Sequence, residues 1–144
     1  MHTQVPTSTS QAGAGRKVLL AEDDSVLLPM YELAFSLAGF QVRIAPDGRQ
    51  ALALAGQEKP DVVVSDYMMP EMTGLALLEH LQANPDLRAI PVVLISNLLG
   101  EQERAQAKSH GASLYIVKSE HKPVDVARIV ADFLRTREVA SSLN

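Results

Sequence analysis

The sequence contains no cysteine and no tryptophan, and its aromatic residues are three tyrosines and three phenylalanines. Without cysteine, the chain cannot form disulfides, zinc–thiolate sites or a thiol nucleophile. No apolar run approaches the ~20 residues that a membrane helix needs. Residues 1–15 also lack the apolar segment of a secretory signal. We therefore expect a cytoplasmic protein with no membrane partner.

Positive charge is also scarce, because 13 lysines and arginines face 17 aspartates and glutamates, for a formal net charge of −4. This balance argues against a protein that binds nucleic acid through general basicity. Hydrophobic residues make up 47% of the 144 residues, which is enough for the core of one domain. We therefore expect one globular domain without a nucleic-acid partner.

The chain divides into three parts by composition. Residues 1–15 are mainly small and polar, and such a segment buries too little apolar surface to offset its ordering entropy. We predict a flexible N-terminal tail over 1–15, a domain over 16–138 and a short C-terminal tail over 139–144.

Within the domain, short apolar runs alternate with amphipathic stretches. The runs predict strands at 18–21, 41–44, 62–65, 92–95 and 114–117. Helices are expected between them, at 25–38, 47–56, 73–82, 99–110 and 123–137, with Ser25, Asp47 and Thr73 as N-terminal caps. Five β–α units in series predict an α/β fold, a doubly wound parallel sheet with helices on both faces.

Polar side chains follow the predicted strands at their carboxyl ends, where ligands bind in such folds. If the first and third strands are neighbours, several carboxylates converge and disfavour one another's charge. A divalent cation such as Mg²⁺ resolves this conflict, because it prefers oxygen ligands. The residues at these strand ends are Glu22, Asp23, Asp24, Asp66, Ser96 and Lys118.

These residue types suit phosphoryl transfer. Asp66 can act as a nucleophile that forms an aspartyl phosphate. Lys118 and Ser96 supply a positive charge and a hydroxyl donor, which neutralise and position the phosphoryl oxygens. For Asp24 we favour a surface or capping role over metal binding.

Four motifs together resemble the receiver domain (CheY-like) of response regulators in two-component signalling. They are LLAEDDS at 19–25, VVVSDYMMPEMTG at 62–74, PVVLIS at 91–96 and GASLYIVK at 111–118. The resemblance implies a flavodoxin-like fold with strand order 2-1-3-4-5. It also implies that a histidine kinase or histidine phosphotransfer protein donates the phosphoryl group.

The resemblance implies a role for each matching residue. Asp66 matches the phosphoacceptor, Lys118 and Ser96 bind the phosphoryl group, and Ser96 with Tyr115 forms the switch. The implied binding site for Mg²⁺, or Mn²⁺, consists of Glu22, Asp23, Asp66 and the backbone carbonyl of Met68. Phosphorylation then alters the face formed by the fourth helix, fifth strand and fifth helix, which binds a downstream protein.

Two departures from the family pattern affect these expectations. Ser119 follows Lys118 where the family usually has a cis proline, so we expect a trans bond there. Lys122 precedes Pro123 and offers a rival register, although Lys118 directly follows the strand. Met68 and Leu98 are apolar at positions that are often polar, which predicts slow self-dephosphorylation.

Alternative functions make different demands on these positions. A phosphatase of the haloacid dehalogenase type would need a second aspartate two residues after Asp66, where Met68 stands. A nucleotide or flavin binder would need a Gly- or hydroxyl-rich loop after the first strand. A phosphorylation-independent pseudo-receiver is the closest rival. We expect a stand-alone receiver that is not a turnover enzyme. The chain could instead be a fragment of a longer regulator. Its oligomeric state stays open.

Overall fold

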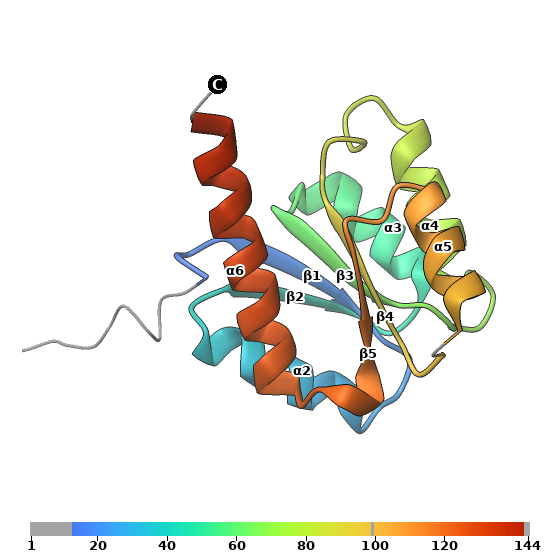
Figure 1. The fold of residues 1–144 in the computed structure, drawn as a ribbon, viewed down its shortest axis with the longest axis horizontal. Helices are drawn as coiled ribbons and strands as arrows, with labels where there is room; N and C mark the ends of the chain where they lie inside the picture. The colour runs from blue at the N-terminus through green and yellow to red at the C-terminus, as the bar shows by residue number, and fades with distance from the viewer. Residues whose placement is uncertain (1–12, 99, 143–144) are drawn as a thin grey trace, which may run out of the picture.

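The computed structural model describes residues 13–98 and 100–142, with side chains as far as residue 140. Its centre is a five-stranded parallel sheet in the order β2-β1-β3-β4-β5, which confirms the predicted fold (Figure 1). The strands are β1 Lys17–Ala21, β2 Gln41–Ala45, β3 Val62–Asp66, β4 Val92–Ser96 and β5 Leu114–Val117.

Helices cover both faces of the sheet (Figure 1). They are α2 Leu27–Leu37, α3 Gly48–Glu58, α4 Gly74–Ala83, α5 Glu101–Ser109 and α6 Pro123–Ser142, with the 3₁₀ turn η1 at Lys118–Glu120. Helices α2 and α6 pack on one face, and α3, α4 and α5 pack on the other. Among the described residues, every helix is too short or too polar to span a bilayer.

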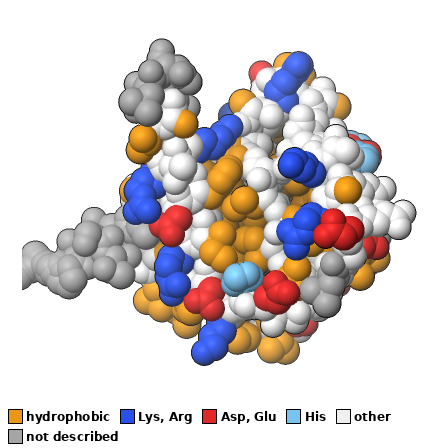
Figure 2. Space-filling model, viewed as in Figure 1, with side chains coloured by type: hydrophobic (Ala, Val, Ile, Leu, Met, Phe, Trp, Pro, Cys, Tyr) orange, Lys and Arg blue, Asp and Glu red, His pale blue; other side chains and the backbone are white. Residues whose placement is uncertain are grey.

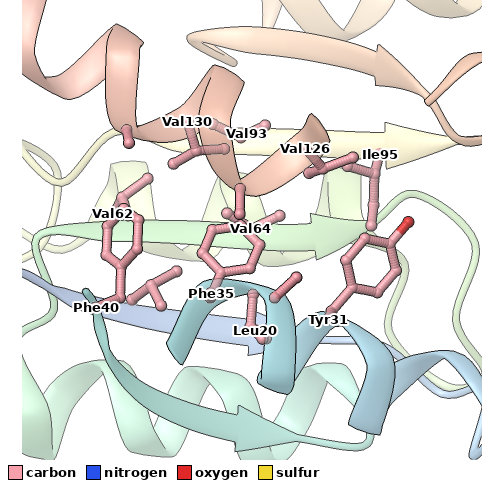
Figure 3. Packing of buried hydrophobic residues seen from close by; sticks show 14 of the residues in the cluster. Leu20, Tyr31, Phe35, Phe40, Val62, Val64, Val93, Ile95, Val126 and Val130 are labelled. Carbon is pink, nitrogen blue, oxygen red and sulfur yellow. The ribbon is translucent and has the colours of Figure 1, made fainter. Parts of the chain in front are cut away.

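Alternation along the strands divides the core between the two faces. In β1, Leu20 packs under α2 and α6, while its neighbour Leu19 packs under the opposite helices. Figure 3 shows Phe35 of α2 and Val130 of α6 among the side chains of the first of these clusters. Every residue of β3 and β4 is buried, because helices cover these strands on both sides.

The helix caps agree with the sequence at two of three expected positions. Asp47 accepts a hydrogen bond from the backbone N–H of Gln50, and Thr73 accepts one from that of Ala76. The predicted cap at Ser25 is wrong. The N-cap residue of α2 is Val26, and its side chain makes no capping hydrogen bond.

Asp24 caps the start of α2 instead of Ser25. Its Oδ1 accepts the N–H groups of Val26 and Leu27 at 2.8 and 3.1 Å. A carboxylate here accepts both donors at once and complements the helix dipole. The capping role expected for Asp24 is therefore observed.

Helix α6 is longer than expected, since it continues to Ser142 instead of ending near 137. Arg16, just before β1, donates to Glu138 on α6 and ties the start of the domain to this last part of the helix. Residues 1–12 of the expected tail, Leu99 and residues 143–144 lie outside the described residues. The division into tails and domain stays a prediction.

Gly74 at the start of α4 should not tolerate a side chain. Its N–H donates to the carbonyl of Tyr67, and a Cβ at this position would lie 2.3 Å from the carbonyl oxygen of Asp66. We expect Gly74→Ala to lower the free energy of unfolding by roughly 2 kcal/mol or more, as measured by urea denaturation.

Gly56→Ala is the matched control, because nothing lies within 4 Å of the added Cβ in the interior of α3. It should stabilise the protein by about 0.5–1 kcal/mol. Equal urea midpoints for the two variants would contradict the close packing of α4 against the end of β3.

Candidate functional site

Acidic side chains from two neighbouring strands meet at the carboxyl edge of the sheet. Ala21 of β1 is in register with Ser65 of β3, so the residues that follow lie side by side. One carboxylate oxygen from each of Glu22, Asp23 and Asp66 lies within 4.8 Å of the others. The predicted convergence of acidic groups is therefore present in the fold.

Glu22 is the most deeply placed of the three, with 2% of its surface exposed. Its Oε2 accepts the backbone N–H of Asp24 at 3.1 Å. Its Oε1 is buried and makes no hydrogen bond to the described residues, although Lys118 Nζ is 2.8 Å away as an ion pair. The Lys118 ammonium therefore offsets part of the cost of burying this carboxylate.

Asp66 is 7% exposed at the end of β3. Burial, together with the negative charge of Glu22, raises the pKa of its carboxyl group to about 7, although Lys118 opposes the shift. A divalent cation would favour the ionised form of the same carboxyl group. The fold thus holds Asp66 in an environment that disfavours its charge unless a second positive charge is present.

Lys118 supplies the positive charge that the chain itself brings to this edge. Its Nζ donates to Asp66 Oδ2 at 3.2 Å and also contacts Glu22. Burial lowers the pKa of Lys118, but the two carboxylates outweigh burial and raise it overall. Lys118 is the first residue of η1 and directly follows the end of β5 at Val117.

The rival register through Lys122 places that lysine elsewhere. Lys122 lines an apolar groove with Met30 and Pro123, between α2 and the start of α6. The described residues contain no cis peptide bond, so Lys118–Ser119 is trans as expected. The geometry favours Lys118 as the lysine of the site.

Ser96 and Tyr115 are joined through one loop residue. Ser96 is buried at the end of β4, and its Oγ accepts the N–H of Leu98 at 3.0 Å. The hydroxyl of Tyr115 donates to the carbonyl of the same Leu98 at 2.9 Å. The two residues predicted to form a switch therefore hold opposite sides of Leu98.

Sequence reasoning overlooked Tyr67, the residue after Asp66. Tyr67 is 7% exposed, its ring packs edge-on against Tyr115, and its hydroxyl donates to Gln106 of α5. Strand alternation was the available signal, because a residue next to Asp66 must point to another side of the sheet. Its contacts with α5 depend on tertiary packing that the sequence does not display.

The cluster is suited to a hard cation such as Mg²⁺ or Mn²⁺. Its donors are three carboxylate oxygens within 4.8 Å of one another, and such cations prefer oxygen ligands. Met68 has a 57% exposed side chain, and the role of its carbonyl stays a prediction. The individual roles of Asp66, Ser96, Tyr115 and Lys118 also stay predictions.

Comparisons with known proteins agree with this architecture. Residues 18–131 match the family described as the response regulator receiver domain. The response regulator PleD from Caulobacter vibrioides is 33% identical over 132 residues, which cover 86% of this chain. The same alignment covers 29% of PleD, so this chain spans less than a third of that relative.

Solved structures of similar chains match over most of their length. The receiver domain of the Francisella response regulator 1452 has a TM-score of 0.77 and 29% identity, and the match covers 86% of this chain and 99% of that one. The receiver domain of a signal transduction histidine kinase from Syntrophus aciditrophicus has a TM-score of 0.76 and 31% identity, with 85% and 92% covered.

The metal-free protein should be stabilised by removing the charge of Asp66. Because the folded-state pKa of about 7 exceeds the unfolded value near 4, ionisation destabilises the fold increasingly from pH 4 and fully above pH 7. At pH 8 in EDTA, Asp66→Asn should raise the melting temperature by roughly 3 °C or more, with little change at pH 4.

Added Mg²⁺ should reverse the order of the two melting temperatures at pH 8, so that the wild type becomes more stable than Asp66→Asn. It should raise the melting temperature of the wild type at pH 8, but have much less effect on Asp66→Asn or Asp23→Asn, each of which loses an anionic ligand. Equal Mg²⁺ shifts in all three proteins would contradict a metal site at this cluster.

Proposed function

Since this chain belongs to the response regulator receiver domain family, we propose that it accepts a phosphoryl group on Asp66 in a Mg²⁺-dependent reaction. The family is one of phosphoacceptors rather than conventional turnover enzymes. The donor we propose is a histidine kinase or a histidine phosphotransfer protein in the cytoplasm. The observation that carries the proposal is the acidic cluster of Glu22, Asp23 and Asp66, with Lys118 against it.

Asp66, Lys118 and Ser96 have different roles in the phosphoryl transfer. An Asp66 carboxylate oxygen forms a bond to phosphorus while the bond from phosphorus to the donor imidazole nitrogen breaks, which leaves an aspartyl phosphate. Lys118, which already contacts Asp66 Oδ2, neutralises a phosphoryl oxygen. The hydroxyl of Ser96 donates to another oxygen of the product.

Glu22, Asp23, Asp66 and the carbonyl of Met68 would hold the metal. When bound, Mg²⁺ would neutralise negative charge on the phosphoryl oxygens. The carboxylates that surround Asp66 would otherwise repel an incoming phosphate. Lys118 counters that repulsion only in part, because it already balances two carboxylates.

The surface that reports phosphorylation is proposed to be the face of α5, β5 and α6, which carries Tyr115. Figure 2 shows hydrophobic side chains gathered between α6 and α5, bordered by lysine and arginine side chains. A groove of about 320 Å³ on this face is lined by Arg104, Lys108, Ala112, Ser113, Leu114 and Tyr115. We propose that a downstream protein binds here when Ser96 and Tyr115 rearrange.

We also propose that the receiver acts as a stand-alone regulator. PleD matches this chain over only part of its length, so a receiver of this kind also occurs within a longer protein. The intact mass of the protein isolated from its native cells distinguishes the two forms. A mass well above that of the 144 residues would show that the receiver is part of a longer regulator.

Phosphorylation of Asp66 can be measured by intact mass spectrometry with acetyl phosphate as the donor. Wild type with Mg²⁺ should gain one phosphoryl adduct, and wild type in EDTA or Asp66→Asn should gain none. Lys118→Ala should be impaired because it removes the cation beside Asp66, whereas the matched variant Lys122→Ala should be phosphorylated normally.

The results that contradict the proposal are equally distinct. An unmodified wild type with Mg²⁺ would favour the phosphorylation-independent pseudo-receiver. Impairment of Lys122→Ala alone would show that the lysine has been assigned in the wrong register. Continuous release of phosphate from a phosphomonoester would identify a phosphatase instead.

The lifetime of the aspartyl phosphate should be prolonged by the lack of a polar group beside it. Met68 and Leu98 are 57% and 38% exposed, and neither side chain can orient a hydrolytic water. We expect Met68→Asn to shorten the lifetime about tenfold, because its amide can position that water. The decay of the phosphorylated mass after removal of acetyl phosphate measures this change.

Leu37→Asn is the control for this experiment, because it places the same amide at an exposed position on α2. Its phosphoryl lifetime should equal that of the wild type. If Met68→Asn also decays at the wild-type rate, the apolar residue at this position does not set the lifetime.

A further inference from the structure

Strand β5 is one edge of the sheet, and among the described residues it pairs with β4 alone. The N–H of Ser113, just before β5, donates to the carbonyl of Val92 on β4 at 2.8 Å. In a parallel pair, every second residue directs both its N–H and its C=O toward the neighbouring strand, and the residues between them direct theirs away. Leu114 and Ile116 therefore present their backbone donors and acceptors at the open edge.

The two edge strands of the sheet differ in how they are protected against further pairing. Strand β2 carries Arg43 at its middle, and Arg43 pairs with Glu58 of α3 at 3.1 Å. A charged residue within an edge strand opposes the addition of another strand. Strand β5 has the sequence LYIV, which contains no charge, proline or glycine. The edge at β5 is therefore the one that is suited to accept an additional strand.

Side chains of two kinds border the open edge of β5. The groove of about 320 Å³ at this edge is lined by Arg104 and Lys108 of α5. Toward α6, the side chains of Leu114, Ile129 and Phe133 are only partly buried against the core under α2 and α6. Figure 2 shows hydrophobic side chains gathered between α6 and α5. A strand added here would meet cationic side chains on one of its faces and apolar side chains on the other.

The two cations beside β5 lack acidic partners. Arg104 and Lys108 lie one helical turn apart on α5, and neither forms an ion pair with a described residue. Arg104 is held at the strand, because its Nη1 donates to the carbonyl of Tyr115 at 3.4 Å and its Cζ lies 5.1 Å from the centre of the Tyr115 ring. The chain as a whole is acidic, with a net charge of −4. This local positive charge therefore favours a partner that carries carboxylates.

We propose that the open edge of β5 binds an extended acidic peptide as an additional strand of the sheet. The inference rests on the proposed function, since it names the binding mode and the chemistry of the partner for the face proposed there. The backbone of the peptide bonds to the free N–H and C=O groups of Leu114 and Ile116. Because side chains alternate across a strand, its apolar residues face the α6 side and its acidic residues face Arg104 and Lys108.

Charge argues against a second copy of this chain as the occupant of the edge. Antiparallel pairing of two β5 strands would place both α5 helices on the same face of the joined sheet. Arg104 and Lys108 of the two copies would then approach one another, and like charges across an interface oppose association. An acidic peptide neutralises the same two side chains, so it is the occupant that the charge distribution favours.

NMR titration of the full chain with a short peptide of alternating valine and glutamate tests the inference. The wild type should bind this peptide, and the amide hydrogens of Leu114 and Ile116 should exchange more slowly in the complex because they become hydrogen-bonded. A peptide of the same composition with its valines and glutamates in two separate blocks should bind about tenfold more weakly. That order cannot place all the glutamates on one face of a strand.

Lys108→Glu distinguishes charge recognition from a general loss of structure. It should bind the valine–glutamate peptide about tenfold more weakly than the wild type, and it should bind the corresponding valine–lysine peptide more tightly. A misfolded variant would bind neither. Lys59→Glu is the matched control, because Lys59 is exposed at the end of α3, a helix that packs on β1 and β2 near the opposite edge of the sheet. It should bind both peptides as the wild type does.

The results that overturn the inference are distinct. Strand addition is wrong if the wild type does not bind the alternating peptide, binds the block peptide equally well, or binds without slower exchange at Leu114 and Ile116. A concentration-dependent dimer that protects the same two amides would identify a second copy as the occupant instead. The titration contains no phosphodonor, so a failure of Asp66 to gain a phosphoryl adduct would remove the proposed function and leave the peptide-binding edge standing.

Discussion

The approach of Glu22, Asp23 and Asp66 to within 4.8 Å of one another is the constraint on which the site depends. Parallel pairing of β1 with β3 brings these carboxylates together, because the two strands end side by side. Such crowding is tolerable only with nearby positive charge. Lys118 supplies part of it, and a divalent cation would supply the rest.

The crowding of charged groups also makes the site sensitive to a change in charge at Asp66. A receiver must distinguish an aspartate from an aspartyl phosphate, and the charge at Asp66 decides which neighbours are attracted to it. Ser96 and Tyr115 stand at the next strands of the sheet and share Leu98 as a common hydrogen-bonding partner. We propose that a local change in charge is passed on through these bonds as a change in packing at β5 and α5.

Much of this arrangement could be predicted from sequence because it depends on local patterns. The buried strands appear as apolar runs, and the Asp47 and Thr73 caps depend on side chains that bond within their own helices. The site residues were predictable because parallel strands bring their carboxyl ends to one edge. Strand order itself came from the family resemblance, since periodicity does not determine which strands are neighbours.

One miss is local, and the other two have a tertiary origin. Ser25 was expected as a cap because serine favours that position, but the neighbouring Asp24 captures the free N–H groups instead. Helix α6 continues past its expected end, where Glu138 meets Arg16 from the other end of the domain. Tyr67 resembles an ordinary residue at a strand end until Tyr115 and Gln106 are placed beside it. A crystal structure with Mn²⁺, located by its anomalous scattering, tests the central claim most directly. The account predicts one ion in contact with the carboxylates of Asp23 and Asp66, and an ion bound elsewhere, or none at a saturating concentration, would contradict it.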